Sequence, residues 1–151
     1  MSTVGSTPVF TPDEASARLR HAVHAKAVNF HAMYSSVLGG IVTDPASMVL
    51  PLDDHMVHRG HAVFDTAMIV NGKLYQLDAH LERLLRSAEM ARLQLPHTPA
   101  QLRQIIIDTA AASRQREASV PSWLSAGPGG FGLAPGECVN GSFYAMIFRA
   151  Q

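Results

Sequence analysis

Arg83 is the side chain of this sequence best placed to bind an anion. It shares one stripe of a predicted helix with His80, Ser87 and Met90, and the apolar stripe of that helix points elsewhere. A guanidinium near the start of a helix can hold a phosphate through two parallel hydrogen bonds, and the helix end adds positive potential. The alternative is a solvated polar face on which the arginine contacts only water. The pattern therefore makes Arg83 a candidate phosphate ligand.

Three histidines, His55, His58 and His61, precede a predicted strand at intervals of three residues. Imidazole is the commonest protein ligand of transition metals, so this spacing invites a metal site. On an ideal helix, however, the three rings would spread over about 120°. No second cysteine or clear carboxylate completes a tetrahedral set, although Asp53 and Asp54 are close. We expect ordinary loop histidines and no bound metal.

A glycine-rich segment, Gly-Pro-Gly-Gly-Phe-Gly, occupies residues 127–132. It lacks the Lys-Ser/Thr ending of a phosphate-binding P-loop, and no helix clearly follows it. The motif alone is therefore weak evidence for a phosphate site. Cys138 follows in the next loop without a neighbouring histidine, and we interpret it as an incidental thiol.

A hairpin and a helix must position Arg83. Asn71-Gly72 separates two apolar runs, 62–70 and 73–77, and both turn residues tolerate the positive φ of a type I′ turn. Asp78 is then predicted to cap a helix. The inner stripe of that helix consists of Leu77, Leu81, Leu84, Leu85, Ala88 and Ala91.

Two more helices and several strands complete the prediction. Thr11 and Thr98 each precede a proline and are predicted N-caps, the first of a helix that reaches about Val28. Further strands are expected over residues 34–42, 47–52, 123–126 and 142–149. Gly39-Gly40 suggests a bulge or a close backbone approach in the first of these. The predicted fold class is α+β, a mostly antiparallel sheet with helices packed on it.

The composition excludes several classes of partner. Lys+Arg and Asp+Glu each number 12, so the net charge is zero and nothing attracts nucleic acid or an anionic membrane surface. No apolar run approaches the roughly 20 residues of a membrane span. The single cysteine and the lack of a secretory signal indicate a cytoplasmic protein, and an organelle is also compatible with both. We expect a flexible lead-in over residues 1–11 and one domain over residues 12–151.

Three segments, in the same order, resemble a known family. They are residues 33–42 (MYSSVLGGIV), residues 53–91 with the sequence HAVFD followed by NGKLYQLDAHLERLL, and residues 123–133 (WLSAGPGGFGL). Together they resemble the N-terminal part of the fold-type IV, pyridoxal-phosphate-dependent transaminases. The resemblance is closest to plant-type D-amino-acid transaminases, often labelled branched-chain-aminotransferase-like. It implies that this chain is the small N-terminal domain of such an enzyme.

The resemblance also implies roles for individual residues. In the family, the arginine of His-x-x-Arg contacts the cofactor phosphate, and that role falls to Arg83. Phe64 takes the position of a pocket-lining aromatic residue, and Asp65 matches the acidic residue after it. Arg59 and His61 then lie at the mouth of the substrate pocket.

The glycine turn belongs to the same implied pocket. In the family its residues approach the substrate carboxylate, and several relatives carry an arginine just before the first glycine. This chain has Ala126 at that position, followed by Gly127. The resemblance therefore places Ala126 and Gly127 in the substrate pocket but without the carboxylate clamp.

The lysine that transaminase chemistry requires has no match in this chain. In that chemistry a lysine binds the cofactor as a Schiff base and moves the α-proton of the substrate. Only Lys26 and Lys73 are present, and neither matches the family's lysine, which lies on a second, C-terminal domain. We therefore expect no catalytic residue here, an absent catalytic-lysine domain, and weak or absent pyridoxal phosphate binding by this chain alone.

The function implied by the resemblance is transfer of an amino group between an amino acid and a 2-oxo acid. A D-amino acid such as D-alanine is favoured as donor and 2-oxoglutarate as acceptor. The alternatives within the family are branched-chain aminotransferase and aminodeoxychorismate lyase. The alternative to an enzyme function is a non-catalytic binding or dimerisation module. The family also implies a homodimer, and we expect an apolar surface where a second domain would pack.

Overall fold

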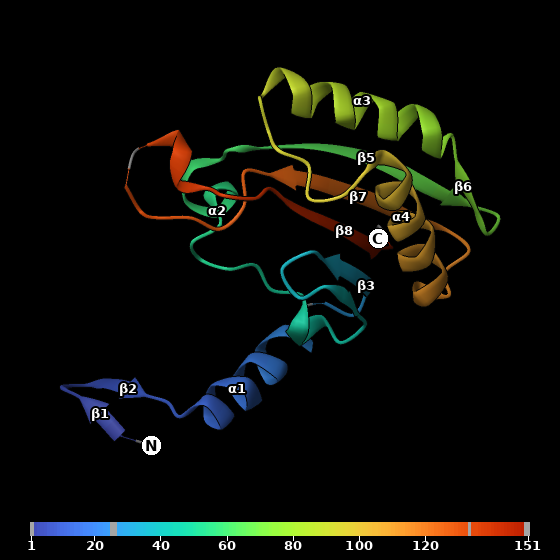
Figure 1. The fold of residues 1–151 in the computed structure, drawn as a ribbon. Helices are drawn as coiled ribbons and strands as arrows, with labels where there is room; N and C mark the ends of the chain where they lie inside the picture. Colours follow the sequence, from blue (N-terminus) through green and yellow to red (C-terminus); the bar gives the residue numbers. More distant parts are fainter. Residues whose placement is uncertain (1, 25–26, 133, 150–151) are drawn as a thin grey trace.

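The computed structural model describes residues 2–24, 27–132 and 134–149, and its centre is a six-stranded antiparallel sheet (Figure 1). The strand order across the sheet is β4-β3-β8-β7-β5-β6. The strands are β3 (Phe30–Ser35), β4 (Gly40–Val42), β5 (Ala62–Val70), β6 (Lys73–Tyr75), β7 (Ala118–Ser125) and β8 (Ser142–Phe148). The predicted α+β class, an antiparallel sheet with helices packed on it, is confirmed.

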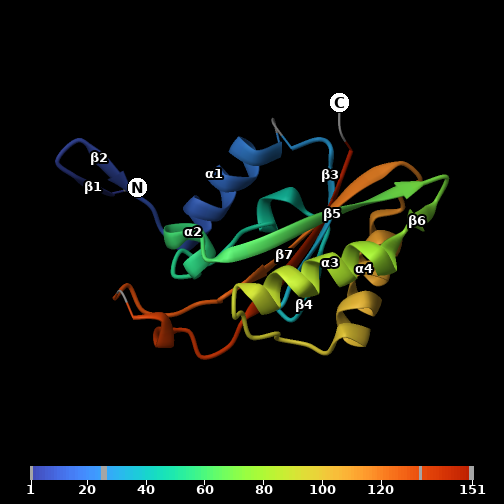
Figure 2. The same ribbon diagram turned by 90° about the horizontal axis from the view of Figure 1, so that it is seen from above.

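Two helices cover one face of the sheet. α3 (Leu77–Met90) lies along β5 (Figure 2), and α4 (Pro99–Ser113) packs against β3 and β8. The predicted inner stripe of α3 is confirmed, because Leu77, Leu81, Leu84 and Ala88 are buried and Leu85 and Ala91 pack against them. These side chains join Leu102 and Ile106 of α4 in one core with the sheet.

The hairpin that leads into α3 forms as predicted. Asn71 and Gly72 have φ values of 52° and 77°, and Val70 pairs with Lys73 across the turn. β6 is short, so it pairs only with Met68–Val70. Residues 62–67 of β5 therefore have no strand on that side within the described part of the chain, which leaves an open edge beside α3.

One predicted cap is confirmed and another is wrong. Thr98 forms a complete capping box with Gln101 at the start of α4. Asp78 does not cap α3, since the connection from β6 is a single residue and the helix already begins at Leu77. The N-cap position falls on Gln76, which has a left-handed backbone and makes no side-chain cap bond. Asp78 lies in the first turn and pairs with Arg103 of α4.

Two strand predictions are wrong in the segment before β5. Residues 34–42 form not one bulged strand but the end of β3, a turn and β4. Gly39 has a φ of 69° and donates its N–H to the Ser35 carbonyl, which reverses the chain. Residues 47–52 form no strand, because Asp44 caps a short 3₁₀ turn, η1 (Pro45–Ser47), and the chain continues irregularly through Pro51.

The N-terminal helix α1 (Pro12–His24) begins as predicted, and residues 25 and 26, which precede its predicted end near Val28, lie outside the described residues. The Thr11 hydroxyl accepts from the Glu14 N–H, and the Glu14 carboxylate accepts from the Thr11 N–H. Ahead of it, where we expected a flexible lead-in, β1 (Ser2–Val4) and β2 (Thr7–Val9) pair as an exposed antiparallel ribbon. No helix in residues 2–24, 27–132 or 134–149 has the length and apolarity of a membrane span.

The sheet face opposite α3 carries exposed apolar side chains. Phe64 is 69% exposed there, and Trp123 is its cross-strand partner on β7. Around them a shallow hollow is lined by Phe30, Phe64, Thr66, Pro121, Trp123, Met146 and Phe148. An apolar surface of this kind is what we expected where another domain or subunit packs.

Candidate functional site

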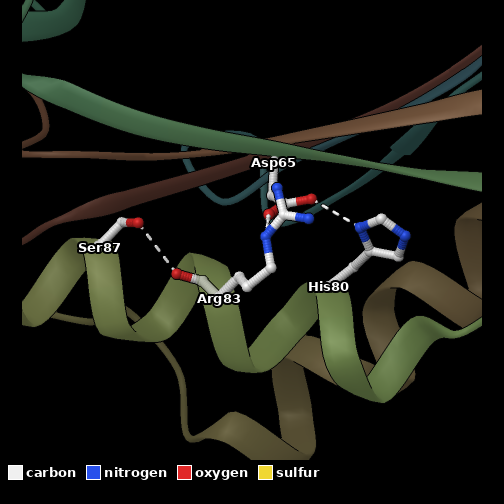
Figure 3. Close-up of polar contacts among 4 residues, drawn as sticks. All are labelled: Asp65, His80, Arg83 and Ser87. Atoms are coloured by element: carbon white, nitrogen blue, oxygen red, sulfur yellow. Dashed lines mark hydrogen bonds and ion pairs between the residues drawn. The ribbon is translucent and has the colours of Figure 1, made fainter.

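α3 places Arg83 over the buried carboxylate of Asp65 on β5 (Figure 3). Nε of Arg83 lies 3.1 Å from Oδ2 of Asp65. The Asp65 side chain is only 7% exposed, whereas the Arg83 side chain is 66% exposed. The carboxylate therefore holds the inner nitrogen of the guanidinium while most of the side chain faces solvent.

His80 contacts the other oxygen of the same carboxylate. Its Nδ1 lies 2.7 Å from Oδ1 of Asp65 (Figure 3). His80 and Arg83 are three residues apart on α3, a spacing that places both on one helix face. A buried carboxylate needs such partners, because removing it from water is costly unless it is paired. The pattern His-x-x-Arg on the helix and Asp65 on the strand thus form one connected group.

We expected the positive potential of the helix N-terminus to contribute to this site, but Arg83 lies too far along α3 for that. Arg83 is the seventh residue of α3, and the favourable potential of a helix N-terminus falls off within the first turn. Attraction for an anion must therefore come from the guanidinium itself. Its hydrogen bonds would be charge-assisted and could be bidentate, which suits a phosphate.

Phe64 and Asp65 lie on opposite faces of β5, because successive side chains of a strand alternate. Phe64 points to the apolar face, and Asp65 points to α3. The structure therefore does not bring Phe64 and Arg83 onto one face. Phe64 and Asp65, the partner of Arg83, both belong to the part of β5, residues 62–67, whose edge has no paired strand in the described part of the chain.

The other predicted pocket residues meet where β5 begins and β7 ends. α2 (His55–Arg59) leads into β5, and the Ala126 N–H donates to the carbonyl of His61 at 3.0 Å. Ala126 is 8% exposed and Gly127 is also buried. The structure thus brings Arg59, His61, Ala126 and Gly127 into one region, although only the first two present partly exposed side chains.

Gly127 is required by the backbone around it. Its φ is 91°, and a Cβ added there would overlap the carbonyl oxygen of Asn140. Its own carbonyl accepts from the His55 N–H at 3.0 Å. The glycine turn therefore packs against the loop before β8 and against α2, which accounts for the glycine without a ligand.

A buried network centred on Asp54 escaped the sequence prediction. Oδ1 of Asp54 accepts from the Ser125 hydroxyl and from the Met56 N–H, and Oδ2 accepts from the Tyr144 hydroxyl. Burial, and then the hydrogen bond to Asp54, hold the pKa of Tyr144 far above its ordinary value of 10.0. Asp54 could be recognised from sequence as the N-cap of α2. Its distant partners gave no local signal.

Two of the three histidines before β5, His55 and His58, have packing roles. His55 is buried, and its Nε2 lies 2.9 Å from the Gly130 carbonyl oxygen. The His58 ring lies between the rings of His55 and Phe131, with centroids 4.9 Å from each. Across the described ranges, no group of three or more His, Cys, Asp or Glu side chains could hold a metal ion.

Neither cysteine nor lysine chemistry is evident at the site. The Cys138 thiol donates to the Gly127 carbonyl, and burial chiefly raises its pKa, so it stays protonated at neutral pH. Lys73 is exposed on β6 beside the hairpin turn, at the opposite end of β5 from Arg59 and His61. Lys26, the other lysine, lies outside the described residues.

The chain is similar to known aminotransferases. The family profile described as Amino-transferase class IV matches residues 62–150. The chain is 52% identical over 146 residues to the D-amino-acid transaminase, chloroplastic, of Arabidopsis thaliana, a match that covers 97% of this chain and 39% of that protein. It is 26% identical over 109 residues to a putative branched-chain-amino-acid aminotransferase of Methanocaldococcus jannaschii, covering 72% of this chain and 38% of that protein.

Solved structures share the fold. The T.th. branched-chain amino acid aminotransferase, complexed with N-(5'-phosphopyridoxyl)-L-glutamate, superposes with a TM-score of 0.71 at 17% identity, covering 80% of this chain and 40% of that one. The Escherichia coli branched-chain enzyme gives a TM-score of 0.69 at 17% identity, covering 79% and 40%. The chain thus spans about 40% of the length of these proteins.

Proposed function

The chain belongs to the class IV aminotransferase family, and on that premise we propose that it forms the cofactor-phosphate side of a pyridoxal-phosphate-dependent transaminase. The observation that carries the proposal is the Asp65–Arg83 pair: an exposed guanidinium is anchored at one nitrogen to a buried carboxylate. Such a group fits a phosphate dianion, because a fixed guanidinium offers N–H donors in the fork geometry that phosphate accepts.

Bound pyridoxal phosphate supplies the electron sink that lets an amino group leave one carbon skeleton and join another. In our proposal Arg83 holds the phosphate of the cofactor. Phe64 lines the pocket on the other side of the β5 edge, and Arg59 and His61 stand at its mouth. Ala126 and Gly127 shape the wall through their backbone. None of these side chains carries the catalytic proton transfer, so the chain alone is expected to be catalytically incomplete.

The proposed substrates are a D-amino acid such as D-alanine and a 2-oxo acid such as 2-oxoglutarate. The identity of 52% with the Arabidopsis protein, whose name is D-amino-acid transaminase, supports this choice. Branched-chain aminotransferase is the first alternative, after the Methanocaldococcus relative. Aminodeoxychorismate lyase is the second, since a bifunctional aminodeoxychorismate lyase / D-amino acid transaminase of Mycobacterium tuberculosis is 33% identical over 72 residues, which cover 48% of this chain and 25% of that protein. We expect a homodimer and a cytoplasmic or organellar location.

Equilibrium binding tests the cofactor assignment. We expect the chain to bind pyridoxal 5'-phosphate weakly, and more tightly than pyridoxal, which lacks the phosphate. Equal affinity for the two would contradict the assignment, because in our proposal Arg83 holds the cofactor by its phosphate.

A dimerisation module is a second candidate role, favoured by the exposed apolar face around Phe64, Trp123 and Phe148. Analytical ultracentrifugation distinguishes it: a dimer that dissociates on Phe64→Ser substitution supports the role. A wild-type chain that stays monomeric over a wide concentration range excludes it.

A further inference from the structure

Asp65 and Asp78 both pair with an arginine on the helices that cover the sheet, and they differ in burial. The Asp78 carboxylate, which pairs with Arg103, is 76% exposed, whereas that of Asp65 is 7% exposed. Both carboxylates contact Nε of their arginine, Asp78 at 2.6 Å and Asp65 at 3.1 Å. Of the two, only Asp65 is buried between a helix and the sheet, and only Asp65 has a ring partner, His80, on its other oxygen.

We propose that Asp65 is a positioning residue for Arg83, aiming its guanidinium at the phosphate, and that His80 braces the carboxylate that does so. The proposal rests on the proposed function. A guanidinium carries one N–H at Nε and two NH₂ groups at its tip. Because Asp65 engages Nε, the contact restricts rotation about the last side-chain bonds and leaves the tip free. An arginine fixed in this way loses less freedom when it binds an anion.

The same carboxylate also has an opposing effect. Its negative charge lies next to the guanidinium and repels a phosphate bound beyond it. Positioning and repulsion therefore predict opposite changes in phosphate affinity when the charge of Asp65 is removed. If repulsion dominates, substitution of Asp65 strengthens phosphate binding. If positioning dominates, as we infer, substitution weakens it.

A purely structural role of the pair is distinguished by phosphate selectivity. Loosening α3 from β5 would weaken pyridoxal 5'-phosphate and pyridoxal alike, whereas loss of aim weakens only the phosphate-bearing ligand. The ratio of their dissociation constants in each variant is therefore the readout. Side-chain NMR of the arginine N–H groups, in the full 151-residue chain, measures weak binding and shows which arginine responds.

We expect Asp65→Ala to reduce the selectivity ratio by about tenfold, the lower end of the effect that loss of a supporting partner has at metal sites. Asp65→Asn retains one acceptor oxygen and should lose less. In an Arg83→Lys background, Asp65→Ala should have no further effect, because an ammonium has no Nε to hold. The matched controls are Asp78→Ala and Arg103→Lys, which break a comparable pair elsewhere on the same helices and should leave the ratio unchanged.

If Asp65→Ala does not fold, a measurement on the wild-type chain tests the proposal instead. Titration with inorganic phosphate should perturb the tip NH₂ signals of Arg83 and leave its Nε–H signal in place. Displacement of the Nε–H signal, or a ratio that rises or stays constant in Asp65→Asn, would overturn the proposal while the phosphate assignment stands. Wild-type binding with no preference for the phosphate ligand, or an Arg83 indifferent to phosphate, would instead overturn the proposed function and the positioning role with it.

Discussion

The hydroxyl of Tyr144 lies 2.5 Å from Oδ2 of Asp54, although the two residues are 90 positions apart in the chain. Both side chains are fully buried, and Ser125 donates to the other oxygen of the carboxylate. This contact joins the loop before α2 to β8, and Ser125 joins it to β7. This buried carboxylate therefore helps to fix the segment that carries Arg59 and His61 to the sheet, together with the backbone bond from Ala126 to His61.

Tyr144→Phe should destabilise the fold. The substitution keeps the ring and removes one donor from a buried carboxylate, which costs about 1–3 kcal/mol. Urea unfolding of the variant and wild type measures the difference. Tyr75→Phe is the matched control, because Tyr75 is 57% exposed and should be nearly neutral. Equal midpoints for Tyr144→Phe and Tyr75→Phe would show that the Asp54 network contributes little.

Stability should fall at high pH because of the same tyrosine. Burial and the Asp54 hydrogen bond raise the pKa of Tyr144 in the folded chain, so above its ordinary value of 10.0 the unfolded chain releases a proton that the folded chain keeps. The stabilisation is complete below pH 10 and is lost as pH rises further, at up to about 1.4 kcal/mol per pH unit for one group. Burial also raises the pKa of Tyr34, so Tyr144→Phe should reduce the slope without abolishing it. An unchanged slope in Tyr144→Phe would contradict this account.

Features encoded by neighbouring residues were predictable from the sequence. The Asn71-Gly72 turn, the Thr98 capping box and the leucine stripe of α3 each depend on residues within one or two turns of chain. Arg83 and His80 share a helix face for the same reason.

Features that depend on distant pairing were not predictable. The start of β7 was missed because of Pro121, since a proline has no N–H to donate and is unusual inside a central strand. In the structure Pro121 nevertheless pairs with Thr66 of β5. Asp65 was recognised only as an acidic residue after an aromatic one, since its contact with Arg83 requires α3 to lie on β5. The Asp54 network needs two strands and a loop to converge.

Gly127→Ala should disrupt the turn between β7 and β8. The glycine has a φ of 91°, and a Cβ there would overlap the Asn140 carbonyl, so the loop must move. We expect a destabilisation of more than about 1 kcal/mol, the scale of backbone strain at such positions. Gly40→Ala is the control, because a Cβ at Gly40 meets nothing within 4 Å. Thermal unfolding compares them, and equal melting temperatures would argue that the loop adapts without cost.

The chain should not catalyse transamination by itself. Lys73 is exposed beside the hairpin turn, so borohydride reduction in the presence of pyridoxal phosphate should label accessible amines without preference for one site. Mass spectrometry locates the adducts, and a coupled assay with D-alanine and 2-oxoglutarate measures turnover. Turnover together with an adduct on a single lysine, abolished by Lys73→Arg, would contradict this prediction.

The most direct test of the account is the preference for pyridoxal 5'-phosphate over pyridoxal in wild type and in Arg83→Gln. Glutamine keeps the helix and most of the side-chain length but removes the guanidinium, and Arg86→Gln, on an exposed pair with Glu82, is the control. We expect wild type and Arg86→Gln to bind the phosphate-bearing ligand more tightly than pyridoxal, and Arg83→Gln to bind both ligands equally. An Arg83→Gln chain that retains the full preference would show that the phosphate is held elsewhere.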